Sequence, residues 1–122
     1  MVVPAWLNPP LVPDDVPIRL DPGMAFGTGT HQSTRLCLRA IEEIADSLLN
    51  KSGYSLLDVG TGSGILAIAA SLMGIPRIVG IDIDYQAVEC AKKNAETNNV
   101  SGKVIFSDAP LQKTGGVFSI IV

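Results

Sequence analysis

Three closely spaced glycines and two aspartates are the residues of this sequence whose types and spacing could do chemistry. The glycines are Gly60, Gly62 and Gly64, and an acidic residue, Asp58, precedes them. Glycines in a turn between a strand and a helix let the backbone approach a ligand and bring N–H groups of the helix N-terminus to a negative group. Asp82 follows the next apolar run, where a carboxylate can accept hydrogen bonds from both hydroxyls of a ribose. Together these residues predict a nucleoside site.

The spacing of the glycines distinguishes between two kinds of nucleoside cofactor. A dinucleotide fingerprint, G-x-G-x-x-G, has its third glycine three positions after the second, behind a pyrophosphate. Here Ile65 occupies that position, and the third glycine is Gly64. The pattern G-x-G-x-G after Asp58 fits a ligand that carries an amino acid, because the turn can meet a carboxylate while Asp58 accepts from an ammonium, directly or through water. We therefore expect S-adenosylmethionine, with an NAD-linked oxidoreductase domain as the alternative.

Two further residues are candidates for contacts to the adenine base. Asp108, at the end of the third predicted strand, could accept a hydrogen bond from the adenine amino group, or could instead be a helix cap or a solvated loop acid. Ile83, directly after Asp82, could cover one face of the base or pack in the core. Both interpretations stay open for each residue.

The hydrophobic pattern places these residues among alternating strands and helices. Strands are predicted over residues 55–59, 77–83, 103–107 and 118–122, and helices over residues 30–49, 65–73 and 84–97. This order predicts an α/β fold with a doubly wound, mainly parallel sheet, Rossmann-like, with right-handed crossovers. The ligand crevice of such a sheet lies beyond the carboxyl ends of the strands, with the turn after the first strand at its centre.

The same pattern predicts which helical side chains are buried. In the first helix, apolar residues recur at spacings of three and four and define one face. They are Leu36, Ala40, Ile41, Ile44, Leu48 and Leu49. Thr30 is the predicted N-cap of that helix, and Asp84 that of the last one. On the last helix we expect Ala87, Ala91 and Ala95 to form the inner stripe.

The chain is long enough for one domain. It has 122 residues, of which 47% are hydrophobic, and this is too short for two ordinary domains. Six of its eight prolines lie in the first 22 residues, so we expect residues 1–18 to be an extended lead-in or linker and residues 19–122 to be the domain.

The last apolar run, residues 118–122, has no polar turn after it. We expect a sheet truncated after its fourth strand, or else a short natural domain with an edge strand there.

Composition narrows the classes of partner. Nine Lys and Arg against twelve Asp and Glu give a net charge of −3, so we expect no direct nucleic-acid partner. No apolar stretch reaches the roughly 20 residues that a bilayer-spanning helix needs, and no signal pattern opens the chain, so we expect no membrane association and a cytoplasmic location. Cys37 and Cys90 are not clustered, and we expect two small buried side chains and no metal site. The sequence indicates no oligomeric state.

Three segments of the sequence resemble a known family. They are DPGMAFGTGTHQST (residues 21–34), LLDVGTGSGILAIAA (residues 56–70) and VGIDIDYQAVECAKKNAETN (residues 79–98). Nearly everything from Ile18 onward resembles the PrmA-type methyltransferases, which modify ribosomal protein L11. The glycine turn is shared with many S-adenosylmethionine-dependent enzymes, whereas FGTGTH, residues 26–31, is much more specific to this family.

The resemblance implies a seven-stranded class I methyltransferase fold, with S-adenosylmethionine as the cofactor. It implies methyl transfer to lysine ε-amines and an N-terminal α-amine of a ribosomal protein. It also carries cofactor contacts onto Thr34 in the first turn of the first helix, onto Gly60, and onto Asp82 at the ribose. Residues 26–30 would fold over the methionine end of the cofactor.

The chain departs from the family pattern at three places. Family members often have Thr where this chain has Ser33, and the serine keeps the hydroxyl group. The family's Asn-containing segment after the fourth strand and its amino-terminal recognition domain are both absent from this sequence. An inert or non-catalytic fragment of the fold is therefore a second alternative.

No catalytic residue is predicted. Displacement at a sulfonium methyl group needs chiefly proximity, orientation and exclusion of water, and we name no general base. His31 is the single histidine, and we expect it to be a structural hydrogen-bonding group.

Overall fold

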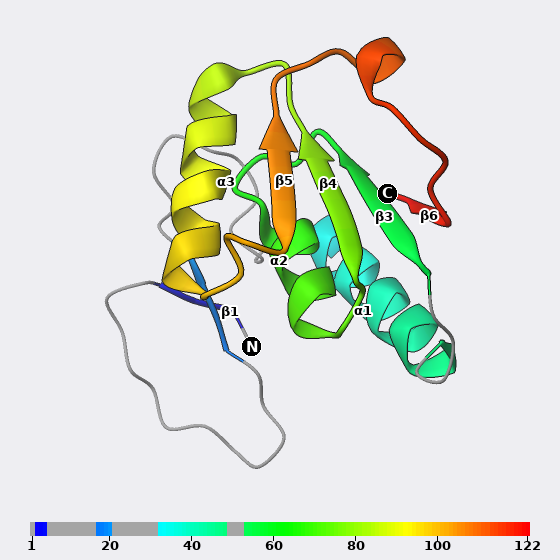
Figure 1. Ribbon diagram of the computed structural model, residues 1–122. Coiled ribbons are helices and arrows are strands. Elements are labelled where there is room, and N and C mark those ends of the chain that lie inside the picture. Colours follow the sequence, from blue (N-terminus) through cyan, green and yellow to red (C-terminus); the bar gives the residue numbers. More distant parts are fainter. Residues whose placement is uncertain (1, 5–16, 21–31, 49–52) are drawn as a thin grey trace.

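The computed structural model describes residues 2–4, 17–20, 32–48 and 53–122. Within these residues the main sheet has four strands in the order β5-β4-β3-β6, and all neighbours are parallel (Figure 1). Its strands are β3 (Ser55–Val59), β4 (Arg77–Ile81), β5 (Val104–Ser107) and β6 (Ile120–Ile121). The helices are α1 (Gln32–Ser47), α2 (Ile65–Leu72) and α3 (Tyr85–Thr97), with a 3-10 helix η1 (Leu111–Lys113). This parallel α/β arrangement confirms the predicted fold class.

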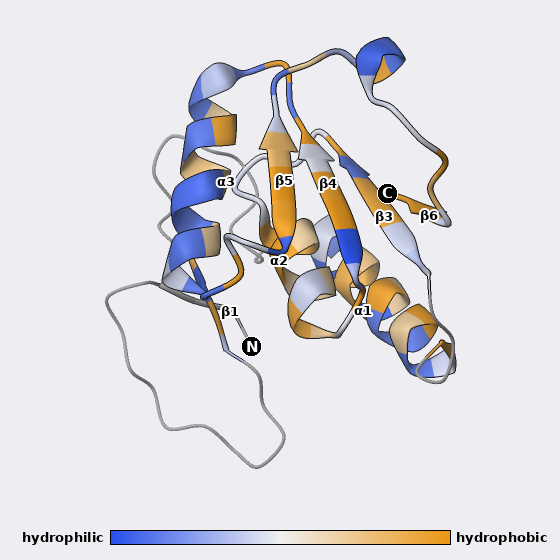
Figure 2. Cartoon of the chain, in the orientation of Figure 1, coloured by the Kyte–Doolittle hydropathy of each residue, from blue (hydrophilic) through white to orange (hydrophobic). Residues whose placement is uncertain are grey.

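Side chains of the central strands alternate between the two faces of the sheet, as the pleat requires. Leu56, Ile78 and Val104 pack with residues of all three α-helices, whereas Leu57 and Val79 cluster on the opposite face. Figure 1 shows α1 and α2 behind the sheet and α3 beside β5. In Figure 2, β3, β4 and β5 are coloured hydrophobic over most of their length, while α3 alternates between the two colours. The main core therefore lies between the sheet and one layer of helices.

The carboxyl end of β4 differs from the prediction. β4 ends at Ile81, and the carboxylate of the next residue, Asp82, accepts hydrogen bonds from the N–H groups of Gly62 and Asp84. The chain therefore leaves the sheet at the point where a ligand crevice is expected.

Helix α3 follows the prediction closely. Asp84 is its N-cap and accepts a hydrogen bond from the N–H of Gln86 at 2.9 Å. The three alanines of the predicted inner stripe, Ala87, Ala91 and Ala95, are buried. Small residues let this helix approach the sheet and the glycine turn closely.

The buried face of α1 differs from the prediction. Ile41 and Ala45 are the buried residues of this helix; Thr34, Cys37 and Leu38 are partly buried, as is Leu48 directly after its end. Leu36, Ala40 and Ile44 were wrong as core residues, because α1 contacts α2 along this narrow stripe and they lie on another side. The proposed cap Thr30 and residue Leu49 lie outside the described residues.

A second, two-stranded sheet was not predicted. β1 (Val2–Pro4) pairs in parallel with β2 (Ile18–Leu20), and the side chains of Ile18 and Leu20 are buried in the main core. β2 therefore crosses the expected boundary between residues 18 and 19, and that boundary stays a prediction.

Both cysteines, Cys37 and Cys90, are half-buried rather than fully buried. In the part of the chain that the structure describes, no helix has the length and apolar character needed to cross a membrane.

Candidate cofactor site

The turn between β3 and α2 contains the three predicted glycines, and each has a left-handed backbone. The φ angles are +72° at Gly60, +56° at Gly62 and +83° at Gly64, a region that side chains disfavour. Gly64 has a second constraint, because a Cβ there would lie 3.0 Å from the Cβ of Ala91 and 3.0 Å from the ring of Phe106. The third glycine thus allows the turn to lie against α3 and β5.

Four N–H groups of this turn are already used within the protein. Those of Gly60 and Thr61 both donate to the carbonyl of Ile81 at 2.9 Å, and that of Gly64 donates to the carbonyl of Thr61 at 2.8 Å. The N–H of Gly62 donates to a carboxylate oxygen of Asp82 at 3.0 Å. Without a ligand these four N–H groups meet protein acceptors, and the expectation that the turn presents N–H groups to a ligand carboxylate stays a prediction.

Asp82 faces the glycine turn from the end of β4. Its Oδ2 accepts from Gly62, and its Oδ1 accepts from the N–H of Asp84 at 2.9 Å. Its own N–H donates to the carbonyl of Ser107 at 3.2 Å, which ties it to the end of β5. A carboxylate has about four acceptor positions, so each oxygen keeps capacity for a hydroxyl donor. The geometry suits the predicted ribose contact, which stays a prediction.

Asp58 lies beneath the turn and is only 2% exposed. Its Oδ2 accepts a hydrogen bond from the hydroxyl of Thr61 at 2.8 Å. Burial raises the pKa of Asp58 from 3.8 to about 6, although hydrogen bonds from Thr61 and the backbone of Ala67 oppose that rise, and the charge of Asp82 adds to it. Two carboxylates therefore share this end of the sheet, and a cation placed near them would stabilise both.

The candidates for adenine contacts lie at the same end of the strands. Ile83 is 96% exposed, so core packing is excluded for it. Asp108 is exposed directly after β5, and the N-cap of η1 is Pro110, so Asp108 does not cap that helix. Roles for both residues at the base stay predictions.

The structure links only some of the predicted residues to one another. Asp58, the glycine turn and Asp82 belong to one cluster joined by hydrogen bonds through Thr61 and Gly62. Thr34 lies in the first turn of α1, as the resemblance implies, and is half-buried outside that cluster. Residues 26–30 and His31 lie outside the described residues.

Two contributors to this cluster, Gly80 and Asn94, were missed by the sequence analysis. A Cβ at Gly80 in β4 would lie 2.6 Å from the ring of Phe106 and 2.7 Å from the hydroxyl of Thr61. Asn94 on α3 is fully buried, and its amide donates to the carbonyl of Ser63 in the turn at 2.9 Å. A glycine inside a strand and a polar residue on an apolar helical stripe were the available signals.

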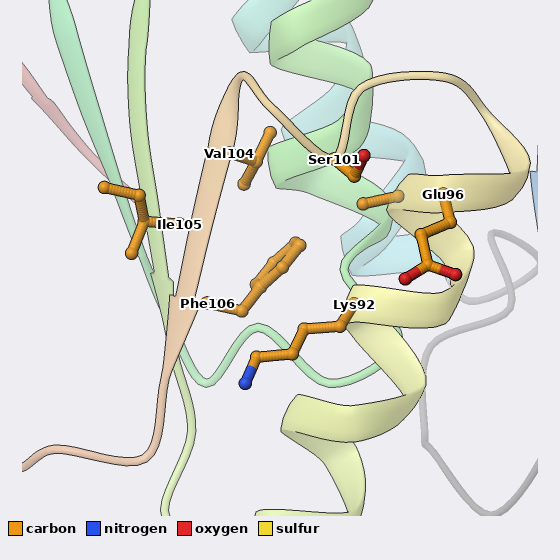
Figure 3. Close-up of a pocket in the computed structure, with 7 residues that line it drawn as sticks. Lys92, Glu96, Ser101, Val104, Ile105 and Phe106 are labelled. Atoms are coloured by element: carbon orange, nitrogen blue, oxygen red, sulfur yellow. The ribbon is translucent and has the colours of Figure 1, made fainter.

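A cavity of about 360 Å³ lies elsewhere, between α3 and β5 (Figure 3). Its lining residues are Lys92, Ala95, Glu96, Ser101, Val104, Ile105 and Phe106. None of the predicted site residues is among them. The cavity is therefore separate from the crevice at the ends of the strands, although Phe106 borders both it and the glycine turn.

A parallel sheet with a glycine turn after β3 and a carboxylate after β4 defines a Rossmann-like α/β domain, a fold class in which ligands bind at the carboxyl ends of the strands. The family model described as "Ribosomal protein L11 methyltransferase (PrmA)" matches residues 1–122. The chain belongs to the ribosomal protein L11 methyltransferase family, which confirms the resemblance found in the sequence.

Individual relatives agree with this assignment. A ribosomal protein L11 methyltransferase of Pelobacter propionicus is 50% identical over the whole chain, which spans 40% of that relative. The crystal structure of a ribosomal protein L11 methylase from Lactobacillus delbrueckii superposes with a TM-score of 0.83 at 36% identity, over 98% of this chain and 59% of that one. An RNA methyltransferase from Salinibacter ruber, solved with S-adenosyl-L-homocysteine, has a TM-score of 0.55 at 31% identity, over 66% of this chain and 50% of that one.

Proposed function

We propose that this chain is the cofactor-binding part of an S-adenosylmethionine-dependent methyltransferase that N-methylates a ribosomal protein on lysine ε-amines and an N-terminal α-amine. The observation that carries the proposal is the cluster of Asp58, the G-x-G-x-G turn and Asp82, in a chain of this family. Family membership also argues against the NAD-linked alternative.

The residues present fit an adenosyl ligand with an amino-acid end. Asp82 would receive the ribose hydroxyls on its remaining acceptor positions, and Ile83 would cover the base. Asp58 is a buried carboxylate whose pKa is raised to about 6, so a nearby ammonium would offset the cost of its charge. The cofactor would supply a methyl group on a positively charged sulfur. The protein's contribution is then to hold the acceptor amine in line with that methyl group and to exclude water.

Family membership supports the proposed partner and location. A ribosomal protein substrate would place the enzyme in the cytoplasm, without a direct nucleic-acid or membrane partner.

The substrate lysine must lose a proton before it attacks, because an ammonium has no lone pair. No residue of the cluster is assigned that role.

Calorimetry on the full gene product tests the cofactor. We expect S-adenosylmethionine to bind with one site and NAD not to bind, and the reverse would overturn the proposal. A second assay follows transfer of a labelled methyl group to ribosomal protein L11, with a lysine-free L11 whose N-terminus is blocked as the control. Binding without transfer would instead favour the non-catalytic alternative.

A further inference from the structure

A buried amide on α3 holds the peptide at the centre of the glycine turn. Asn94 is 0% exposed, and its Nδ2 donates to the carbonyl of Ser63 at 2.9 Å. The same nitrogen lies 3.6 Å from the sulfur of Cys90. Burying an amide in a helix–sheet core costs free energy unless it is hydrogen-bonded, so this position is a specific arrangement rather than ordinary packing.

The carbonyl that Asn94 holds belongs to a residue between two glycines. Ser63 stands between Gly62 and Gly64, which both have positive φ angles. Glycines have many accessible conformations, so the direction of the Ser63 carbonyl is not determined by local sterics alone. Two peptides earlier in the turn, between Thr61 and Gly62, Asp82 accepts the N–H of Gly62 at 3.0 Å. Two peptides of the turn are thus hydrogen-bonded to side chains from two different elements.

The helix that carries Asn94 is itself held firmly. One turn further along, the side chain of Asn98 accepts from the N–H of Arg19 at 2.7 Å and donates to the carbonyl of Arg19 at 2.6 Å. This amide pairs with β2 as a neighbouring strand would. Ala91 and Ala95, on either side of Asn94, are buried in the core. The backbone position of Asn94 is therefore fixed by the packing and hydrogen bonds of its helix.

We propose that Asn94 is a positioning residue of the cofactor site, which sets the conformation of the glycine turn before a ligand binds. This inference rests on the proposed function, because the ligand is taken to be S-adenosylmethionine. A turn that is already ordered loses less conformational freedom on binding. Without the amide, the Ser63 carbonyl is left without this donor and the turn must be ordered at the expense of binding free energy.

The test compares three variants of the full gene product. Asn94→Leu keeps the approximate volume and removes the donor. Asn94→Ser removes the contact to Ser63 but can satisfy its own hydroxyl on the helix backbone, so it serves if the leucine variant fails to fold. Val88→Ala, a fully buried core position on the same helix, is the control that lowers stability without touching the turn.

We expect the Asn94 variants to raise the Kd for S-adenosylmethionine by about tenfold, measured by calorimetry well below each Tm. Val88→Ala should lower Tm while its Kd stays within about twofold of the unmodified protein. Amide exchange at Gly64 should also be faster in the Asn94 variants than in Val88→Ala. An unchanged Kd in a folded Asn94 variant overturns the positioning role. If the unmodified protein does not bind S-adenosylmethionine, the proposed function itself is wrong.

Discussion

The carboxylate of Asp82 accepts a hydrogen bond from the N–H of Gly62 at 3.0 Å, and this contact joins the end of β4 to the turn that follows β3. The two residues follow neighbouring parallel strands, whose carboxyl ends meet at one edge of the sheet. A ribose bound at Asp82 would therefore lie next to the glycine turn.

Replacing Asp82 tests its role at the ribose. Asp82→Asn keeps the size and one acceptor oxygen but removes the charge, so we expect the Kd for S-adenosylmethionine to rise by about tenfold or more. Calorimetry on the full gene product measures it. Asp46→Asn, an exposed position on α1, removes an equal charge away from the cluster and should bind normally. Equal affinity of the two variants would contradict the assignment.

The buried carboxyl of Asp58 should make stability depend on pH. Its pKa rises from 3.8 to about 6 on folding, so the folded state binds a proton more tightly than the unfolded state. The stabilisation is fully present below pH 3.8 and is lost as the pH rises through about 6, amounting to about 3 kcal/mol.

Urea unfolding between pH 4 and pH 7 measures this effect. Asp58→Asn has no such titration, so its free energy of unfolding relative to the unmodified protein should rise across that interval. Asp46→Asn should instead run parallel to the unmodified protein. Parallel curves for Asp58→Asn would show that Asp58 titrates alike in the folded and unfolded states.

The same titration should appear in ligand binding. The ammonium of S-adenosylmethionine favours the ionised form of Asp58, so we expect affinity to increase as the pH rises through about 6. S-adenosylhomocysteine carries the same ammonium and should show the same dependence, whereas adenosine, which lacks it, should not. A pH dependence shared by adenosine would mean that the effect does not come from the ammonium.

Gly64 should tolerate substitution less well than another glycine of similar backbone conformation. In Gly64→Ala the new Cβ meets Ala91 and Phe106 at 3.0 Å, so conformational strain and overpacking together should cost about 2–4 kcal/mol of stability. Gly74→Ala is the matched control, because Gly74 has a φ of +96° but open space around it. It should lose only about 1–2 kcal/mol. Equal losses in thermal or urea unfolding would show that the close approach at Gly64 is unimportant.

Features decided within a few residues of the chain could be predicted from the sequence. The cap at Asp84, the alanine stripe of α3 and the glycine turn depend on local backbone geometry and helical periodicity. The sequence motifs around the turn also indicated the family to which the chain belongs. The strands were found because their apolar runs are short and separated by turn residues.

What the turn does with its polar groups was decided by the tertiary structure. Elements far away in the chain determine which N–H groups of the turn are occupied, as at Gly60 and Gly62. They also determine the exposure of Ile83 and the contact from Asn94 to Ser63. The buried stripe of α1 was likewise set by its contact with α2. Sequence by itself determined which residues could form a nucleoside site and in which elements they lie. Only the folded chain decided which of their donors and acceptors the protein uses itself, because hydrogen-bond partners and burial are properties of the packed structure rather than of local spacing.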